Sequence, residues 1–170
     1  MCTFSFMSDI SQLSYLRLMD ESDLAQIYEI ELKSYDYPWT LNGFEKSLDQ
    51  GLNYVFCNAE GSILGYCCIL PVLDEATVLN LCVSPAYQRQ GIAKKALLQL
   101  LTTLRESSYS TVFLEVRESN LAAQNLYKQL GFSEDGIRKG YYRAQAWDEV
   151  LMELVDEKED AILMSFRLVE

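Results

Sequence analysis

Histidine is absent from the 170 residues of this sequence. Histidine is the side chain that most often acts as a general base near neutral pH, and it is also the commonest metal ligand. We therefore expect no metal site. Any acid–base chemistry must use carboxylates, tyrosine or water.

Long hydrophobic runs are also lacking. The longest apolar run covers residues 65–73, whereas a membrane span requires ~20 residues. The amino terminus has neither a basic region nor a cleavage site of the kind found in signal peptides. We expect a cytoplasmic protein with no membrane contact.

The cysteines form no C-x-x-C pair, which argues against a redox motif or a zinc site. Two of them are adjacent within the apolar run. Free cysteine is usually buried. We therefore expect buried free thiols at all five positions, Cys2, Cys57, Cys67, Cys68 and Cys82.

Acidic residues outnumber basic residues by 25 to 14, which gives a formal net charge of −11. This charge argues against direct nucleic acid binding and favours cationic partners. A chain of this length with 49% hydrophobic residues can bury one continuous core, so we expect one domain over residues 1–170. Residues 1–10 have no clear period and are expected to be an appendage, since Met7 could equally be the translation start.

Periodicity and capping residues predict an α/β (α+β) chain. Helices are expected to begin after Asp20, Thr40, Gly91 and Asn120, and the last of them to end at Gly131. Strands are expected at residues 16–18, 53–58, 63–73, 76–83, 111–117 and 161–168.

The segment before the final strand departs from this pattern, and we treat residues 143–158 as an insertion. Residues 148–160 hold seven acidic residues opposed by Lys158 alone. A solvated helix or loop accounts for such a charge run. Residues 147–155 could form an extra amphipathic helix.

The turn at residues 88–93 lies between an apolar strand and an amphipathic helix. Backbone N–H groups and the helix dipole converge there, where an anion could dock. Gly91 permits close backbone approach, and Arg89 and Lys94 add positive charge suited to a diphosphate. The alternative is an ordinary glycine before a helix.

This turn resembles the coenzyme A loop of the GNAT acetyltransferase superfamily, Q/R-x-x-G-x-G/A, through Gln88, Gly91 and Ala93. Residues 72–91, 114–117, 126–127 and 130–132 are similar to the bacterial ribosomal-protein-alanine N-acetyltransferases (RimI-like). The resemblance implies a GNAT fold, with a mixed, mostly antiparallel sheet that is splayed between strands 4 and 5 and flanked by helices.

The resemblance also implies acetyl-CoA as cosubstrate and a set of residues that bind it. Backbone groups of the fourth strand would pair with the pantetheine arm in the manner of an added strand. The implied cofactor-binding residues are Leu81, Cys82, Val83, Arg89, Gln90, Gly91, Ile92, Ala93, Lys94 and Asn120. Asn120 is also explained as a helix cap.

Direct attack of an amine on a thioester needs a proton acceptor and a proton donor. Glu115 interrupts an apolar strand, and partial desolvation there would make it a stronger base. The alternative is a structural ion pair with Arg117 on the same strand face. The resemblance implies that Tyr127 protonates the departing thiolate, although most aromatics at helical spacing pack into the core.

The resemblance further implies an acceptor, the N-terminal alanine of a small-subunit ribosomal protein, whose basic chain suits an acidic enzyme. Pro38, Trp39 and Tyr142 would line the peptide groove, or pack into the core instead. The insertion departs from the family pattern and leaves other acceptors open: another protein N-terminus, a lysine or a small amine. A non-catalytic acyl-CoA-binding module is the remaining alternative.

Overall fold

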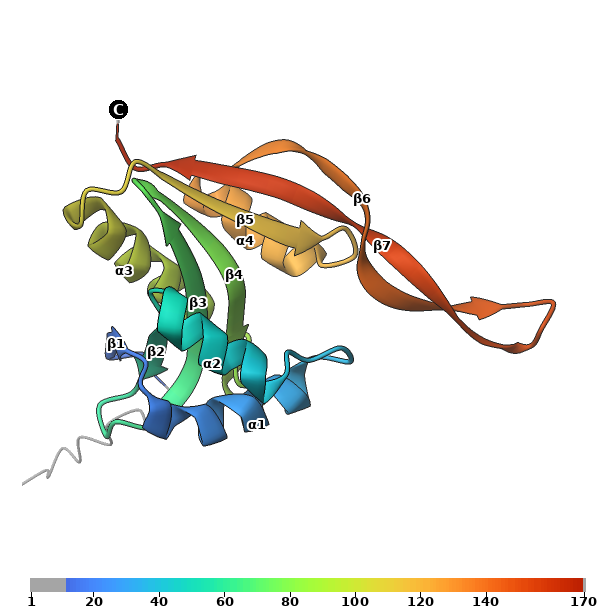
Figure 1. Cartoon of the computed structure of the whole chain (residues 1–170), viewed down its shortest axis with the longest axis horizontal. Coiled ribbons are helices and arrows are strands. Elements are labelled where there is room, and N and C mark those ends of the chain that lie inside the picture. Colours follow the sequence, from blue (N-terminus) through green and yellow to red (C-terminus); the bar gives the residue numbers. More distant parts are fainter. Residues whose placement is uncertain (1–11, 170) are drawn as a thin grey trace, which may run out of the picture. The chain divides into compact units, whose positions relative to one another are not determined.

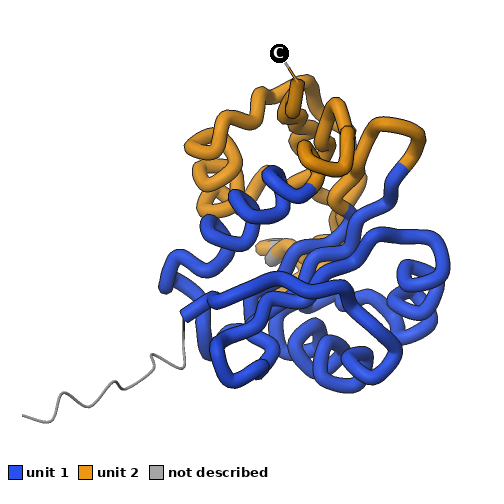
Figure 2. Tube along the Cα trace, turned by 90° about the vertical axis from the view of Figure 1, so that its left-hand side faces the viewer, with its two compact units in different colours: residues 1–71, 79–103 blue, residues 72–78, 104–170 orange. Residues whose placement is uncertain are grey.

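The computed structural model describes residues 12–169, so the predicted appendage and Cys2 lie outside the described residues. Unit 1 comprises Met1–Pro71 and Leu79–Thr103, and unit 2 comprises Val72–Val78 and Leu104–Glu170 (Figure 2). The single domain expected from the sequence stays a prediction. None of the helices in residues 12–169 has the length and hydrophobicity needed to cross a membrane.

Helices and strands follow one another largely in the predicted order (Figure 1). The helical elements are η1 (Glu21–Asp23), α1 (Leu24–Ser34), α2 (Leu41–Gln50), η2 (Pro85–Tyr87), α3 (Ile92–Glu106) and α4 (Leu121–Leu130). The strands are β1 (Tyr15–Leu18), β2 (Tyr54–Cys57), β3 (Ile63–Val72), β4 (Glu75–Val83), β5 (Thr111–Arg117), β6 (Ser133–Asp148) and β7 (Glu153–Arg167).

The strands form one seven-stranded sheet in the order β1–β2–β3–β4–β5–β7–β6. β1 with β2, β2 with β3, β5 with β7 and β6 with β7 pair antiparallel, whereas β4 pairs parallel with β5. The predicted mixed, mostly antiparallel sheet is confirmed. The parallel register covers Glu75–Val78 and Thr111–Leu114, the first halves of the two strands.

Side-chain caps begin the helices where the sequence predicted them. Asp20 and Asp23 form a reciprocal capping box, and the Thr40 side chain accepts a hydrogen bond from the Gly43 N–H at 3.1 Å. Asn120 caps α4 in the same way, and Gly131 ends it with a φ of 100°. These local bonds satisfy backbone groups that the helices themselves leave unpaired.

The core of unit 1 packs α1 and α2 against β2 and β3. Phe44 lies at its centre, with its ring centroid 5.4 Å from those of Trp39 and Tyr66. The four described cysteines, Cys57, Cys67, Cys68 and Cys82, are free and buried as predicted. Burial raises the pKa of the Cys68 thiol to about 12.

A buried carboxylate, Glu31 of α1, joins several elements of unit 1. It is 1% exposed and accepts hydrogen bonds from the Trp39 N–H at 2.7 Å and from the Tyr66 hydroxyl. Asn80 of β4 donates to both of its oxygens at 3.3 Å. Burial raises the pKa of Tyr66, and the nearby carboxylate adds to that shift, so Tyr66 remains a donor.

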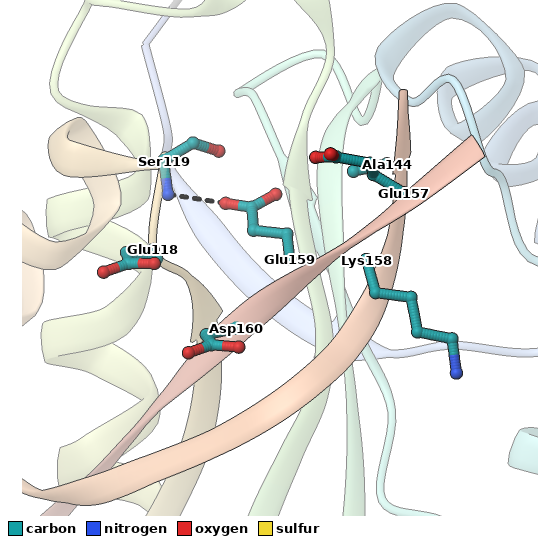
Figure 3. A pocket seen from close by; sticks show the side chains of 7 residues that line it. All are labelled: Glu118, Ser119, Ala144, Glu157, Lys158, Glu159 and Asp160. Carbon is teal, nitrogen blue, oxygen red and sulfur yellow. Dashed lines mark hydrogen bonds between the residues drawn. The ribbon is translucent and has the colours of Figure 1, made fainter. Parts of the chain in front are cut away.

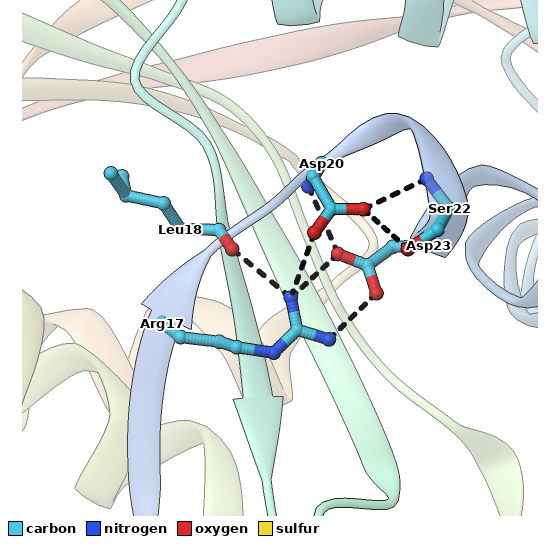
Figure 4. Close-up of polar contacts among 5 residues, drawn as sticks. All are labelled: Arg17, Leu18, Asp20, Ser22 and Asp23. Atoms are coloured by element: carbon cyan, nitrogen blue, oxygen red, sulfur yellow. Dashed lines mark hydrogen bonds and ion pairs between the residues drawn. The ribbon is translucent and has the colours of Figure 1, made fainter.

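A second polar cluster holds β1 to the start of the helical segment (Figure 4). Arg17 donates to both oxygens of Asp23 at 2.7 Å, and the Asp23 side chain is 5% exposed. The hydrogen bonds and charge of Arg17 hold the pKa of Asp23 below its usual range, although burial opposes the shift. The pair therefore stabilises the folded state when Asp23 is ionised.

Gly65 lets β3 lie very close to the end of β4. A Cβ atom at this position would lie 2.3 Å from the Cys82 carbonyl oxygen and 3.0 Å from the Val83 Cα atom. Both obstacles are backbone atoms, which cannot turn aside as a side chain does. Glycine is thus required where β4 carries two of the predicted pantetheine-binding residues.

Unit 2 is built around β5, whose side chains alternate between buried and half-buried positions. β7 pairs with β5 from Thr111↔Arg167 to Arg117↔Ala161 and continues beyond it, paired with β6. β6 and the first half of β7 were not predicted from the sequence. The extra helix predicted at residues 147–155 is wrong, because these residues form the end of the β6–β7 hairpin.

Gly65→Ala should lower the free energy of unfolding by about 1–3 kcal/mol, because the new methyl group overlaps backbone atoms of β4. Urea denaturation measures this change. Gly136→Ala is the matched control, since a Cβ at Gly136 meets no heavy atom within 4 Å. Its effect should stay within about 0.5 kcal/mol. An equal loss in both variants would contradict the close approach at Gly65.

Asp23→Asn should lower the free energy of unfolding at pH 7 by about 1.5 kcal/mol, a low value for charged hydrogen bonds because Arg17 is partly exposed. A depressed aspartate pKa contributes stability above about pH 4 that is lost as the pH falls. The gap between wild type and variant should therefore close on acidification.

Denaturant titrations across the acidic range measure that gap. Glu29→Gln is the control, since Glu29 forms an exposed pair with Lys33 at 3.5 Å. A gap for Asp23→Asn that is the same at every pH would contradict the assigned ion pair.

Candidate active site

The turn after β4 contains two residues in the left-handed backbone region. Arg89 and Gly91 have positive φ angles of 59° and 78°. The Gly91 carbonyl accepts the first bond of α3, from the Lys95 N–H at 3.1 Å. The N–H groups that precede Lys95 in the first turn of α3 have no partner within the helix. Ile92 is 2% exposed and anchors the turn in the core, while Arg89 and Lys94 are exposed.

The backbone of the adjoining β4 segment already binds side chains of unit 1. The Leu81 carbonyl accepts a hydrogen bond from the Tyr35 hydroxyl at 3.0 Å, and the Val83 carbonyl accepts one from Gln88 Nε2 at 3.0 Å. Cys82 is buried, and burial raises the pKa of its thiol. A pantetheine amide that donated to these carbonyls would have to use their second lone pairs or displace Tyr35 and Gln88.

Pro38 and Trp39 follow α1 in the same unit. Trp39 is half-buried, packs against the core around Phe44, and donates its backbone N–H to Glu31. The core-packing interpretation therefore accounts for Trp39. A contribution of Pro38 and Trp39 to a peptide groove stays a prediction.

Glu115 occupies a half-buried position on β5 in unit 2. Its carboxylate accepts a hydrogen bond from Arg138 of β6 at 2.8 Å. Arg117 shares its strand face, as predicted, but pairs with Glu159 at 3.1 Å. The predicted alternative, a Glu115–Arg117 ion pair, is therefore wrong. The partner of Glu115 is Arg138 of β6, the strand that lies beyond β7 in the sheet.

Tyr141 and Tyr142 complete the surroundings of Glu115. The Tyr142 hydroxyl donates to the Glu115 carbonyl at 3.1 Å, and burial, with a smaller contribution from the Glu115 charge, raises the pKa of Tyr142 to about 12. The guanidinium of Arg117 lies 4.4 Å from the Tyr142 ring centroid, and that of Arg138 lies 4.1 Å from the Tyr141 ring centroid. The predicted substrate residue Tyr142 thus lies beside the predicted base.

Tyr127 lies on the buried face of α4 and is 8% exposed. Its ring centroid is 5.7 Å from that of Phe132, which in turn packs on Phe166 at 5.3 Å. This position agrees with the core-packing interpretation.

Asn120 is held at the start of α4 by its neighbours. Its side chain accepts from the Ala123 N–H at 3.1 Å, so the predicted cap is confirmed. Glu159 accepts from the adjacent Ser119 N–H at 2.6 Å and from Arg117. Burial opposes ionisation of Glu159, but these bonds outweigh it and lower its pKa.

A shallow pocket of about 530 Å³ lies beside this loop (Figure 3). Its polar lining is rich in carboxylates and comes from Glu118, Ser119, Glu157, Lys158, Glu159 and Asp160. In Figure 3 the Lys158 side chain points away from the carboxylates of Glu157 and Glu159. Glu159 and Asp160 already pair with Arg117 and Lys139, so a cationic group in the pocket would meet chiefly Glu118 and Glu157.

The described site residues fall into two groups. Unit 1 holds the cofactor turn, the β4 segment and the Pro38–Trp39 turn; unit 2 holds Glu115, Asn120, Tyr127 and Tyr142. Residues 24–132, which include the turn, Glu115 and Tyr127, match the model of the Acetyltransferase (GNAT) family. The chain belongs to the GNAT acetyltransferase family. The family match ends before β6, so the β6–β7 hairpin lies outside it.

Relatives of this GNAT chain carry a more specific name. It is 36% identical to the [ribosomal protein bS18]-alanine N-acetyltransferase of Escherichia coli strain K12 over 149 residues, which cover 86% of this chain and 93% of the relative. It is 40% identical over 124 residues to the enzyme of that name from Haemophilus ducreyi, covering 72% and 84% of the two chains.

Solved structures agree. The crystal structure of the ribosomal-protein-S18-alanine N-acetyltransferase from Escherichia coli matches with a TM-score of 0.80 and 32% identity, covering 92% of this chain and 94% of that one. Ard1 from Thermoplasma volcanium, at 22% identity and a TM-score of 0.74, shows the fold alone. The predicted GNAT fold and the resemblance to ribosomal-protein-alanine N-acetyltransferases are confirmed. The chain is an acyltransferase.

The sequence did not predict three sets of contacts in the candidate site. They are the pairing of Arg138 with Glu115, the packing of Tyr141 against Arg138, and the bonds of Glu159. Arg138 and Tyr141 lie in β6, which was not predicted. Glu159 was seen as part of an acidic run, without its bonds to Ser119 and Arg117. The usable signal was the mixed charge of residues 134–143, which resembles an edge strand rather than a loop.

Proposed function

We propose that this GNAT enzyme transfers the acetyl group of acetyl-CoA to the α-amino group of an N-terminal alanine in a small-subunit ribosomal protein. The observation that carries this proposal is the 36% identity to the bS18-alanine N-acetyltransferase over 86% of the chain. The net charge of −11 agrees with a basic acceptor, because opposite charges accelerate encounter.

The turn after β4 has the properties needed to hold the pyrophosphate of acetyl-CoA. Positive φ angles at Arg89 and Gly91 turn the chain so that the first N–H groups of α3 can face an anion. The charges of Arg89 and Lys94 add to this attraction in an otherwise acidic protein. Residues 89–94 would bind the pyrophosphate, Leu81, Cys82 and Val83 the pantetheine arm, and Asn120 another polar group of the cosubstrate.

The reaction we propose is direct transfer. The neutral amine attacks the thioester carbonyl and forms the new C–N bond, and the C–S bond breaks as the tetrahedral intermediate collapses. Glu115 accepts the proton that leaves the nitrogen, and Tyr127 donates a proton to the departing thiolate. A phenol with a reference pKa near ~10 can protonate a thiolate whose reference pKa is near ~8.5.

The ion pair with Arg138 bears on the role of Glu115. A guanidinium at 2.8 Å forms a charge-assisted hydrogen bond with the carboxylate and holds the Glu115 side chain in place. Arg138 is 56% exposed, so solvent screens its charge.

A different acceptor is the second candidate, and the extended β6–β7 hairpin is the observation that favours it. Tyr142, which we place at the acceptor site, lies at the base of that hairpin. Because residues 143–158 lengthen the hairpin relative to the family pattern, they change the surface that an incoming acceptor meets. Another protein N-terminus, a lysine or a small amine would then be acetylated by the same acid–base pair.

Glu115→Gln and Tyr127→Phe should each lower kcat about 100-fold or more, because each removes one proton transfer. The Glu115→Gln effect should be largest at low pH, where more of the amine carries the proton that has to be removed. Binding of acetyl-CoA should change less than about twofold. Thiol release measures the rate and a calorimetric titration measures the binding.

Glu134→Gln, which alters an exposed pair with Lys128, is the control and should keep full activity. Tyr127→Phe retains the ring that packs on Phe132, so its stability should stay within about 0.5 kcal/mol of wild type. Parallel losses of thermal stability and activity in both variants would assign Glu115 and Tyr127 purely structural roles.

Thiol release should occur with peptides that begin with alanine. Peptides blocked at the amino terminus that offer lysine alone, and simple polyamines, should give no release. Turnover with only the blocked lysine peptides or the polyamines would rule out acetylation of an N-terminus, although the protein would still be an acetyltransferase. No release with any acceptor, together with no binding of acetyl-CoA, would refute the proposed reaction.

A further inference from the structure

The β6–β7 hairpin continues well beyond the rest of unit 2. We call residues 143–158 the arm; its six paired positions run from Arg143↔Lys158 to Asp148↔Glu153. The register of β7 with β5 ends at Arg117↔Ala161, so the arm is a two-stranded ribbon (Figure 1). Such a ribbon is marginally stable alone in water and gains stability from a partner on its surface.

The end of the arm exposes a cluster of large apolar side chains. Val150 is 90% exposed and Met152 70%, and Leu151 and Leu154 are each 59% exposed. Single exposed apolar residues are common on protein surfaces, whereas four within five consecutive positions form a patch. This patch fits an apolar side chain of a partner.

The rest of the arm is acidic, with five acidic and two basic residues. Side chains alternate along β7, so Glu153, Glu157 and Glu159 share one face. Opposite them β6 places the small residues Ala144 and Ala146, paired with Glu157 and Val155. Small neighbours leave the Glu157 carboxylate accessible beside the acidic pocket of Figure 3.

This acidic face leads to the proposed reaction site. Tyr142 pairs with Glu159 on the same face, and its hydroxyl reaches the Glu115 backbone. From Tyr142 the arm extends about 20 Å at ~3.3 Å per residue. An extended acceptor chain covers that length with about six residues.

We propose that the arm binds a basic segment of the acceptor protein that lies within about six residues of the acetylated amino terminus. The carboxylates of Glu153 and Glu157 contact its lysine or arginine side chains, and the apolar end of the arm contacts an aliphatic one. This inference rests on the proposed function and names how that acceptor is recognised. The net charge of −11 disfavours a second copy of this chain or a nucleic acid as occupant.

Acceptor length and charge test this proposal. Wild-type enzyme should show a KM about three- to tenfold lower for an alanine-starting peptide of about 10 residues that is basic from its third residue on than for its first ~2 residues. A neutral peptide of the same length should behave like the short one. The advantage should shrink at about 0.5 M salt.

The double variant Glu153→Gln/Glu157→Gln should lose most of that advantage and retain wild-type turnover of the short peptide. Val150→Ser should lose part of it, because the residue is exposed and its change leaves the fold intact. Glu45→Gln/Asp49→Asn, two exposed carboxylates on α2, is the matched control and should retain the full advantage.

A binding titration separates this proposal from the proposed function. The probe is the long basic peptide with its amino terminus already acetylated, followed by fluorescence anisotropy. Weaker binding by the double variant supports the arm even if no peptide is acetylated. Equal binding by the double variant and wild type overturns the arm proposal and leaves the acetyltransferase assignment intact. Sedimentation that shows a dimer for wild type and a monomer for Val150→Ser also overturns the arm proposal.

Discussion

The carboxylate of Glu31 connects the parts of unit 1 that carry the predicted cosubstrate site. It lies on α1 at 1% exposure and receives hydrogen bonds from the turn at Trp39, from Tyr66 of β3 and from Asn80 of β4. A carboxyl group so deeply buried requires hydrogen-bond partners, so the elements that supply them must keep their places. Asn80 directly precedes Leu81, and the position of the β4 segment therefore depends on this one side chain.

The absence of histidine makes the environment of Glu115 decisive. In a site without imidazole, a carboxylate has to be ionised near neutral pH and still accept a proton. Arg138 pairs with the Glu115 carboxylate at 2.8 Å and is itself 56% exposed. Tyr142 fixes the backbone of Glu115 through its carbonyl, so the position of the side chain depends on β6 as well as on β5.

Features with local causes were predictable from the sequence. Asp20, Thr40, Asn120 and Gly131 act on backbone groups within four residues, and each begins or ends its helix as expected. β6 was missed, because mixed charge is a weak signal of an edge strand and the order of β6 comes from its pairing with β7. The helix predicted at residues 147–155 failed because the chain reverses there: Met152, with a φ of 55°, lies in the turn between β6 and β7. Arg138 contacts Glu115 across β7, and the sequence separation of these two residues gives no indication of this contact.

The arm also has a consequence for how copies of the protein meet. Each of its two strands has an outer edge, and such edges readily add a strand from another molecule, especially beside exposed apolar residues. Like charges oppose that addition, and the arm carries five acidic residues along a short ribbon. The carboxylates that we assign to recognition of a basic chain thus act as gatekeepers against edge-to-edge aggregation. A protein with this hairpin cannot exchange them for apolar residues without becoming prone to assemble with itself.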